Sequence, residues 1–336
     1  MKVWKLTATN TLTSSDAPLP EPSEGLRKIR VTKVLITNTD SLIFDGTLKT
    51  GYPLIPGRCA VGLIADDGGS EGYKKGTRVL LHTYLPVRDS GTEKKDFGED
   101  DFAVCGQTAD GYLQDFVLRS EDEITPLPDS VSDDEALLLE NIALAKATAD
   151  AINVQKGQHV AVIGGDILGL IMCQLLIYRQ AAPIFIDSFP SRLDFARASG
   201  VYYSLPEDEE LLNGVGTLTG GRLTDSSVYI TTVGSDDPTL PLKVCGRGGK
   251  VAFCGFAGQG IDIPFEEMLK KHLTLYGITG NPDNIPSAIN LLVNEAIDLS
   301  FVKVVSFPAE RAAEAFASRV GNPASAISDL NVIELI

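Results

Sequence analysis

Short apolar runs alternate with helix-like segments through the second half of the chain, from about residue 155. The runs have the length and content of buried strands, and the segments between them have helical periodicity. The strand-like runs are 159–164, 183–187, 228–234, 250–255 and 273–278, and the helix-like segments are 167–179, 190–200 and 238–246. This alternation predicts a doubly wound parallel sheet of the α/β class.

The first 130 residues follow a different pattern, in which short β-rich runs are separated by Gly, Pro and Asp turns. Runs at 28–37, 60–65, 77–85 and 111–118 predict an irregular antiparallel β-barrel rather than a βαβ array. The charged, turn-rich stretch 89–101 is expected to be an exposed loop.

Between and after these regions, three further helices are expected. One covers 132–151, with Ser132 as its N-cap and acidic residues in its first turn. The tail, from about 282, contains helical patterns at 284–298 and 309–320 and ends in a β-like run at 331–336.

Composition narrows the class of protein. A chain of 336 residues suggests two domains, and 43% hydrophobic content indicates a globular protein. With 29 basic and 45 acidic residues the net charge is −16, which disfavours nucleic acid and anionic membranes as partners. We see no apolar signal region and no run of 18 apolar residues. Five scattered cysteines without a C-x-x-C pair favour a reducing, cytoplasmic location.

The stretch VIGGDILG, residues 162–169, departs by one residue from the glycine fingerprint G-x-G-x-x-G of dinucleotide sites. It follows a predicted strand and opens a predicted helix, whose N-terminus can hold a phosphate. Gly164 permits a tight turn, and Gly169 lets the helix pack close to the strand. Asp187 follows Gly164 by 23 residues, and a carboxylate there accepts hydrogen bonds from an adenosine ribose. The pattern favours NAD(H) over NADP(H).

Asp166 stands in place of the second glycine, where the backbone approaches a pyrophosphate most closely. A carboxylate within ~4–6 Å of a pyrophosphate is repelled unless a cation or a rotamer change relieves it. Alternatively, Asp166 caps the helix and occupies the place of the phosphate. A further alternative is that the turn serves the sheet alone, with no ligand, because any parallel sheet needs tight turns between strand and helix. We expect an occupied site with Asp166 turned away from the pyrophosphate.

The whole chain resembles the medium-chain dehydrogenase/reductase superfamily of zinc alcohol and polyol dehydrogenases. The family's V-x-G-x-G-x-x-G and D-x-x-x-x-R-L-x-x-A-x-x-x-G correspond here to VIGGDILG and DSFPSRLDFARASG. The resemblance implies a GroES-like barrel as catalytic domain, residues 1–148 and 282–336, and a Rossmann domain, residues 149–281. It also implies a cofactor site formed by Gly164, Gly165, Asp166, Ile167, Leu168, Gly169, Asp187, Arg192, Val233, Gly255, Phe256 and Ile278.

The same resemblance predicts that both zinc sites of the family are lost. Thr37 replaces the thiolate ligand, Arg58 replaces the imidazole ligand, and only Glu140 matches a carboxylate ligand of polyol-type members. One carboxylate beside a guanidinium does not form a zinc site, because zinc needs a thiolate, an imidazole and a third ligand. Of the structural-zinc cysteines only Cys105 remains. We therefore expect no metal.

The catalytic candidates are Thr39, Arg58 and Glu140. Thr39 matches the family's relay hydroxyl and can donate a hydrogen bond to a carbonyl oxygen, while Arg58 can stabilise oxyanion charge. Each also has a structural interpretation: Thr39 as a hydroxyl satisfied by the backbone, and Arg58 as the partner of Glu140 or Asp40 in a salt bridge. Cys59, beside Arg58, is expected to be a packing residue unless that charge lowers its pKa.

Two functions remain open, and a third possibility is a phosphate-free ligand site in which Asp166 binds a ribose or an amine. The first is a zinc-independent oxidoreductase that moves hydride between a nicotinamide cofactor and a carbonyl, an alcohol or an activated C=C bond in the interdomain cleft. The second is a pseudoenzyme that keeps the fold as a binding or scaffold protein. The resemblance also implies a homodimer formed through the sheet edge at 273–278.

Overall fold

The computed structural model describes residues 1–22, 24–69, 72–86, 102–231, 237–255, 263–320 and 329–335. The chain forms two compact units. Unit 1 contains 1–137, 304–322 and 330–336, and unit 2 contains 138–303 and 323–329. The unit boundaries therefore differ from the domain boundaries expected from the sequence, because 138–148 and 282–303 pack with unit 2. The helices of these two segments, α3 (Leu139–Ala151) and α9 (Ile285–Val293), lie against each other.

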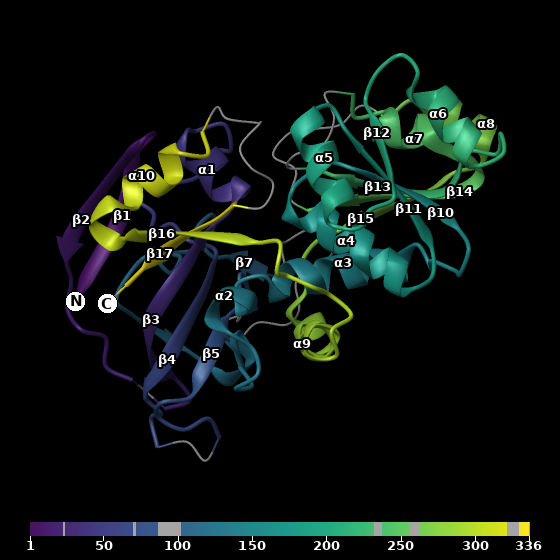
Figure 1. The fold of residues 1–336 in the computed structure, drawn as a ribbon. Helices are drawn as coiled ribbons and strands as arrows, with labels where there is room; N and C mark the ends of the chain where they lie inside the picture. The colour runs from purple at the N-terminus through teal and green to yellow at the C-terminus, as the bar shows by residue number, and fades with distance from the viewer. Residues whose placement is uncertain are drawn as a thin grey trace, which may run out of the picture. The chain divides into compact units, whose positions relative to one another are not determined.

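Unit 1 is built on an antiparallel sheet with the strand order β16-β17-β3-β4-β5-β9, to which β8 adds by pairing with β3. The remaining strands of unit 1 among the described residues form two small two-stranded sheets, β1-β2 and β6-β7. The C-terminal strand β17 pairs with β3, so the end of the chain returns to the N-terminal sheet (Figure 1). This is the GroES-like barrel that the sequence predicts.

The elements of unit 1 follow the predicted β-rich runs. Its strands are β1 (Lys2–Ala8), β2 (Thr11–Asp16), β3 (Arg27–Ile36), β4 (Cys59–Asp66), β5 (Arg78–Leu81), β6 (Tyr84–Pro86), β7 (Phe102–Val104), β8 (Phe116–Arg119), β9 (Ile124–Pro126), β16 (Lys303–Pro308) and β17 (Asp329–Glu334). Its helices are α1 (Asn38–Phe44), α2 (Asp133–Ala136), α10 (Ala312–Ala317) and the 3-10 turns Glu121–Glu123 and Ala309–Arg311. The predicted loop 89–101 lies outside the described residues.

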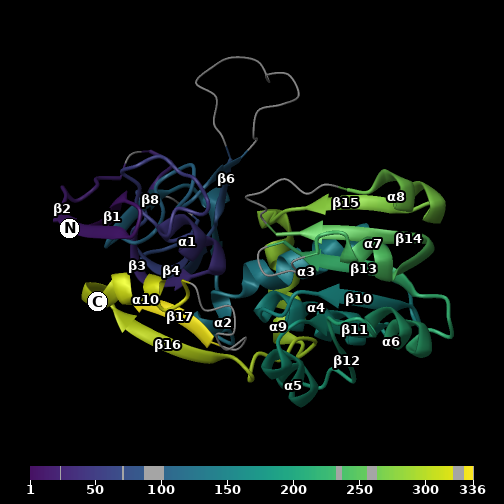
Figure 2. The same ribbon diagram turned by 90° about the horizontal axis from the view of Figure 1, so that it is seen from above.

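Unit 2 is a six-stranded sheet in the order β12-β11-β10-β13-β14-β15, and every neighbouring pair is parallel. Figure 2 shows these strands stacked in this order. The order reverses between β10 and β13, which is the switch point where Rossmann sheets bind their ligands. The predicted doubly wound sheet is confirmed.

The elements of unit 2 follow the predicted alternation and add one strand, Tyr203–Pro206, and two helices, Leu211–Leu218 and Phe265–Lys271, that were not predicted. Its strands are β10 (His159–Ile163), β11 (Ala182–Asp187), β12 (Tyr203–Pro206), β13 (Thr224–Ile230), β14 (Cys245–Cys254) and β15 (Thr274–Ile278). Its helices are α3, α4 (Ile167–Tyr178), α5 (Pro190–Ala198), α6 (Leu211–Leu218), α7 (Leu240–Val244), α8 (Phe265–Lys271), the 3-10 turn Pro282–Asn284 and α9.

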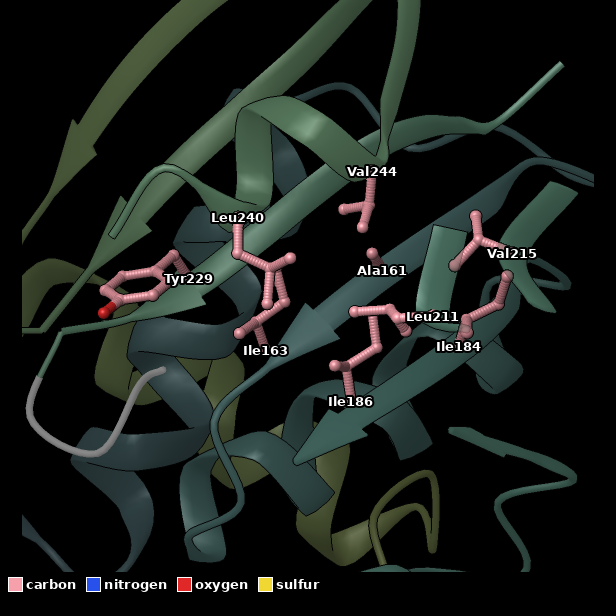
Figure 3. Packing of buried hydrophobic residues seen from close by; sticks show 9 residues of the cluster. All are labelled: Ala161, Ile163, Ile184, Ile186, Leu211, Val215, Tyr229, Leu240 and Val244. Atoms are coloured by element: carbon pink, nitrogen blue, oxygen red, sulfur yellow. The ribbon is translucent and has the colours of Figure 1, made fainter. Parts of the chain in front are cut away.

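Helices α6 and α7 cover one face of the sheet with apolar side chains. Figure 3 shows Leu211 and Val215 of α6 and Leu240 and Val244 of α7 directed at the strands. The strand residues that meet them are Ala161, Ile163, Ile184, Ile186 and Tyr229. The alternate residues of β10, Val160 and Val162, are fully buried as well. Burial on both faces explains why the strands of a parallel sheet are almost continuously apolar.

The segment 132–151 differs from the single helix predicted for it. Ser132 does cap a helix, since its side chain accepts a hydrogen bond from the backbone N–H of Glu135. That helix, α2, is only one turn long and ends at Ala136, and α3 begins at Leu139. In the part of the chain that the structure describes, no helix has the length and apolar character needed to cross a membrane.

Helix α4 packs closely against the strand that precedes it, and this packing depends on Gly169. A Cβ at Gly169 would lie 2.3 Å from the carbonyl oxygen of Gly164. We expect Gly169→Ala to destabilise the protein by about 1–3 kcal/mol, because the backbone must shift to accommodate the methyl group. Urea unfolding measures this change.

Gly216, inside α6, is the matched control because a Cβ there would meet nothing within 4 Å. Gly216→Ala is expected to leave stability unchanged or to raise it by up to about 1 kcal/mol through helix propensity. Equal stabilities of the two variants would contradict the close packing of α4.

Candidate functional site

The turn between β10 and α4 has the backbone conformation that its first glycine permits. Gly164 has φ +108°, a region that residues with a Cβ rarely adopt. Its N–H donates to the carbonyl oxygen of Ile186 at 3.2 Å, which ties the turn to the neighbouring strand β11. A Cβ at Gly165 would lie 2.2 Å from Oδ2 of Asp187. The turn therefore brings the backbone of Gly165 directly against the Asp187 carboxylate.

Asp166 is the N-cap of α4. Its Oδ1 accepts a hydrogen bond from the backbone N–H of Gly169 at 3.1 Å. Of the orientations left open by the sequence, the structure contains the capping one, so our expectation that Asp166 turns away from this position was wrong. Capping is favourable because the carboxylate satisfies an N–H that has no partner within the helix and lies at the positive end of the helix dipole.

Asp187 and Arg192 form a buried pair at the carboxyl end of β11. Nη1 of Arg192 lies 3.3 Å from Oδ2 of Asp187, and the backbone N–H of Phe189 donates to Oδ1 at 2.9 Å. Arg192 also lies over the Phe189 ring, 4.9 Å from its centroid. A carboxylate has about four acceptor positions. Two hydrogen bonds from the chain therefore orient Asp187 and leave acceptor capacity for the two hydroxyls of a ribose.

The other predicted cofactor residues that the structure describes fall at the same edge of the sheet. Gly255, with φ +99°, follows β14 directly, and its N–H donates to the carbonyl oxygen of Ile278 at the end of β15. The side chains of Ile167 and Leu168 are buried in the first turn of α4. Val233 and Phe256 lie outside the described residues. The carboxyl ends of β11, β10, β14 and β15 thus carry the candidate residues that the structure describes.

Cys254, the last residue of β14, is affected by the charge of Asp166. Burial raises the pKa of the Cys254 thiol to about 12, and the negative charge of Asp166 contributes to that rise. Cys254 is therefore a packing residue in its neutral form, as its apolar surroundings in the sequence suggest. The effect also indicates that the field of Asp166 extends from the turn to the end of β14.

A second group of polar side chains is buried in unit 1, at the start of α1. Thr37 caps α1, and its hydroxyl donates to Oδ2 of Asp40 at 2.5 Å. Burial raises the pKa of the Asp40 carboxyl, while the charge of Arg58 and hydrogen bonds from Thr37 lower it in part. Arg58 is itself buried and donates through Nη1 to Oε1 of Gln107 at 2.8 Å.

The sequence left open whether Arg58 pairs with Glu140 or with Asp40, and this buried group answers part of that question. The charge of Arg58 acts on Asp40, one of the two partners considered, and its guanidinium donates a hydrogen bond to Gln107. Sequence reasoning missed Gln107, because a glutamine 49 positions away carries no motif that links it to Arg58. Thr39 is buried in the first turn of α1, and Glu140 is half-buried in the first turn of α3.

Comparison with known proteins agrees with both units. Residues 23–129 match the family model for the alcohol dehydrogenase GroES-like domain, and residues 168–294 match that for zinc-binding dehydrogenase. The chain belongs to the medium-chain dehydrogenase/reductase superfamily of zinc-type alcohol dehydrogenase-like proteins.

Among its relatives is an uncharacterised zinc-type alcohol dehydrogenase-like protein of Haemophilus influenzae, 24% identical over 305 residues and 87% of each chain. The L-threonine 3-dehydrogenase of Rhizobium etli is 28% identical over 277 residues and 79% of each chain. A solved alcohol dehydrogenase from Escherichia coli CFT073, in complex with NADH, shares the fold with a TM-score of 0.85 at 18% identity, covering 100% of this chain and 99% of that one.

The residues at the zinc-ligand positions of this dehydrogenase-like protein do not fit a metal. The Thr37 hydroxyl is used in the cap of α1, and the Arg58 guanidinium has no lone pair to offer. Cys59 is buried and lies 3.6 Å from the carbonyl oxygen of Leu137, to which its thiol donates. In the described ranges, no three His, Cys, Asp or Glu residues are grouped as metal ligands.

The raised pKa of Asp40 predicts a pH dependence of stability. Between the usual value of 3.8 and the higher folded-state pKa, the folded chain keeps a proton that the unfolded chain has lost. Asp40 therefore lowers the free energy of unfolding as pH rises through this window, by about 1.4 kcal/mol for each unit of pKa shift. We expect the stability of Asp40→Asn, relative to wild type, to increase with pH from about 4 upward.

Urea unfolding of both proteins at a series of pH values measures this difference. Asp129→Asn, at an exposed position, controls for the substitution itself. A difference between Asp40→Asn and wild type that stays constant or shrinks as pH rises would contradict the assignment.

Proposed function

We propose that this protein is an NAD(H)-linked oxidoreductase that works without zinc. The buried pair Asp187–Arg192 carries the proposal, because it is oriented at the carboxyl end of β11 beside the turn 164–169. A ribose-binding carboxylate at this place, next to a close-packed glycine turn, is the recognition element of a dinucleotide site. The fold shared with the Escherichia coli enzyme, which holds NADH, supports the proposal.

The residues of the turn fit the adenosine half of the cofactor. Gly165 lets the Asp187 carboxylate lie against the turn, where a Cβ would collide with it, and the two hydrogen bonds from Phe189 and Arg192 hold the carboxylate in place. The negative charge of Asp187 repels the additional 2′-phosphate of NADP(H), so the site prefers NAD(H). When bound, the nicotinamide supplies the hydride chemistry.

On the substrate side, Thr39, Arg58 and Glu140 are our candidates, and the substrate is a carbonyl, an alcohol or an activated C=C bond. Thr39 would donate a hydrogen bond to the substrate oxygen. Arg58 would provide a permanent positive charge in place of a metal, since a guanidinium stays protonated at all working pH values. Its hydrogen bond to Gln107 holds that charge in a fixed position, so it needs no reorganisation when oxyanion charge develops.

A pseudoenzyme is the second candidate, and a specific observation favours it. The N–H of Gly169, which a cofactor phosphate would use, is already bound to Asp166. In addition, Thr37 and Arg58 stand at the positions where the family has zinc ligands. A pseudoenzyme that keeps the packing of the fold but has lost the groups that bind phosphate and zinc would have these features. Such a protein would act by binding a partner.

We also propose that the protein is a cytoplasmic homodimer formed through β15. This strand is one of the two outer strands of the parallel sheet, and its residues are exposed or half-buried. An exposed edge of a sheet offers unpaired N–H and C=O groups to a second copy of the chain. All five cysteines are buried, which is compatible with a reducing compartment.

A fluorescence titration with NADH and NADPH separates the two candidate functions. We expect NADH to bind and NADPH to bind at least ~10-fold more weakly, a ratio that corresponds to about 1.4 kcal/mol of repulsion at Asp187. Asp187→Asn should reduce this preference by removing the charge. Absence of binding for both cofactors at millimolar concentration would reject the oxidoreductase and leave the pseudoenzyme.

Metal analysis tests zinc independence. We expect less than ~0.1 zinc per chain in protein purified with zinc in the medium, and no loss of cofactor binding after treatment with EDTA. The double variant Thr37→Cys/Arg58→His brings back the ligand types that the family uses and should retain more zinc than wild type. Stoichiometric zinc in the wild type would contradict the proposal.

A further inference from the structure

The first N–H groups of a helix have no partners within it, and at a glycine-rich turn these groups bind phosphate. At the start of α4, Asp166 serves one of these groups instead. Its Oδ1 accepts a hydrogen bond from the backbone N–H of Gly169 at 3.1 Å. A pyrophosphate at this turn must therefore compete with a carboxylate that is attached to the helix itself.

The charges around the turn also disfavour a phosphate. Two carboxylates lie there: Asp166 on the helix N-terminus and Asp187 against the backbone of Gly165. The guanidinium of Arg192 lies 3.3 Å from Asp187 and compensates that carboxylate. Binding of a phosphate thus adds a negative charge next to the carboxylate of Asp166, and the two like charges repel each other.

We propose that Asp166 fills the phosphate position of the nucleotide site with the protein's own carboxylate. The site then recognises the nucleoside part of its ligand through Asp187 and gains no affinity from the phosphates. The inference rests on the proposed function, because it assumes that an adenine dinucleotide or a related nucleoside is the ligand. Asp166 is accordingly the residue that limits cofactor affinity.

Two substitutions at position 166 separate the effect of the negative charge from the effect of a side chain that occupies the N–H of Gly169. Asn caps helices as well as Asp does, so Asp166→Asn keeps the hydrogen-bond acceptor and removes the charge. Asp166→Gly removes both and brings back the glycine of the fingerprint, and glycine is itself tolerated at the N-cap position. The φ of Asp166 is −100°, so neither variant strains the backbone. Thermal unfolding verifies that both are folded.

Calorimetric titration with adenosine and with ADP, in EDTA to exclude bridging cations, measures what the phosphates contribute. For the wild type we expect a ratio of Kd(adenosine) to Kd(ADP) of about 1 or below. The ratio should rise ~3–10-fold in Asp166→Asn, which removes the charge repulsion. It should rise ~10–100-fold in Asp166→Gly, which also removes the competition for the N–H of Gly169. The Kd of adenosine should stay within ~2-fold in all three proteins, because its contacts are with Asp187.

A parallel titration with NADH distinguishes failure of this inference from failure of the proposed function. Tighter binding of NADH in both variants than in wild type supports the inference. If wild type binds NADH, and ADP ~10-fold or more tighter than adenosine, the inference is overturned and the oxidoreductase stands. If only the variants bind NADH, Asp166 does block the site and the wild type is no NAD(H) enzyme. If none of the three binds adenosine, ADP or NADH, both are wrong.

Discussion

The close contact between the N-terminus of α4 and the turn after β10 is the constraint on which the nucleotide half depends. Gly169 lies so near the Gly164 carbonyl that no Cβ fits between them. This contact fixes where the helix begins and therefore where its unpaired N–H groups point. It also brings Gly165 against Asp187 on the neighbouring strand. The position of the helix and the approach of the turn to Asp187 thus depend on glycines, which have no Cβ.

The two units share a chemical theme in the way charge is supplied. Where the family places a positive metal ion, this chain has the guanidinium of Arg58, hydrogen-bonded to Gln107 and close enough to act on Asp40. Where a dinucleotide enzyme receives a negative phosphate, this chain has the carboxylate of Asp166. In our proposal, a side chain of the same sign takes the place of the ligand in each case.

Periodicity and glycine spacing were sufficient to predict the parallel sheet, α4 and the position of Asp187, because burial on both faces leaves a strong apolar pattern. The orientation of Asp166 was not predictable, since capping and turning away are both ordinary side-chain conformations. The partners of Arg58 were likewise hidden, because Gln107 reaches it only through the tertiary fold. The break between α2 and α3 at Leu137 and Leu138 was not predictable from the sequence either, since the apolar pattern of the segment continues through it.

The central claim is that a nucleoside is held at Asp187 while Asp166 keeps the backbone N–H of Gly169. A crystal structure of the wild-type protein with NADH tests it most directly. We expect the adenosine ribose hydroxyls within hydrogen-bond distance of the Asp187 carboxylate, Asp166 still bound to the N–H of Gly169, and the pyrophosphate displaced from that N–H. A complex in which the pyrophosphate binds the N–H of Gly169 and Asp166 has rotated away, or in which no nucleotide lies at Asp187, would contradict the account.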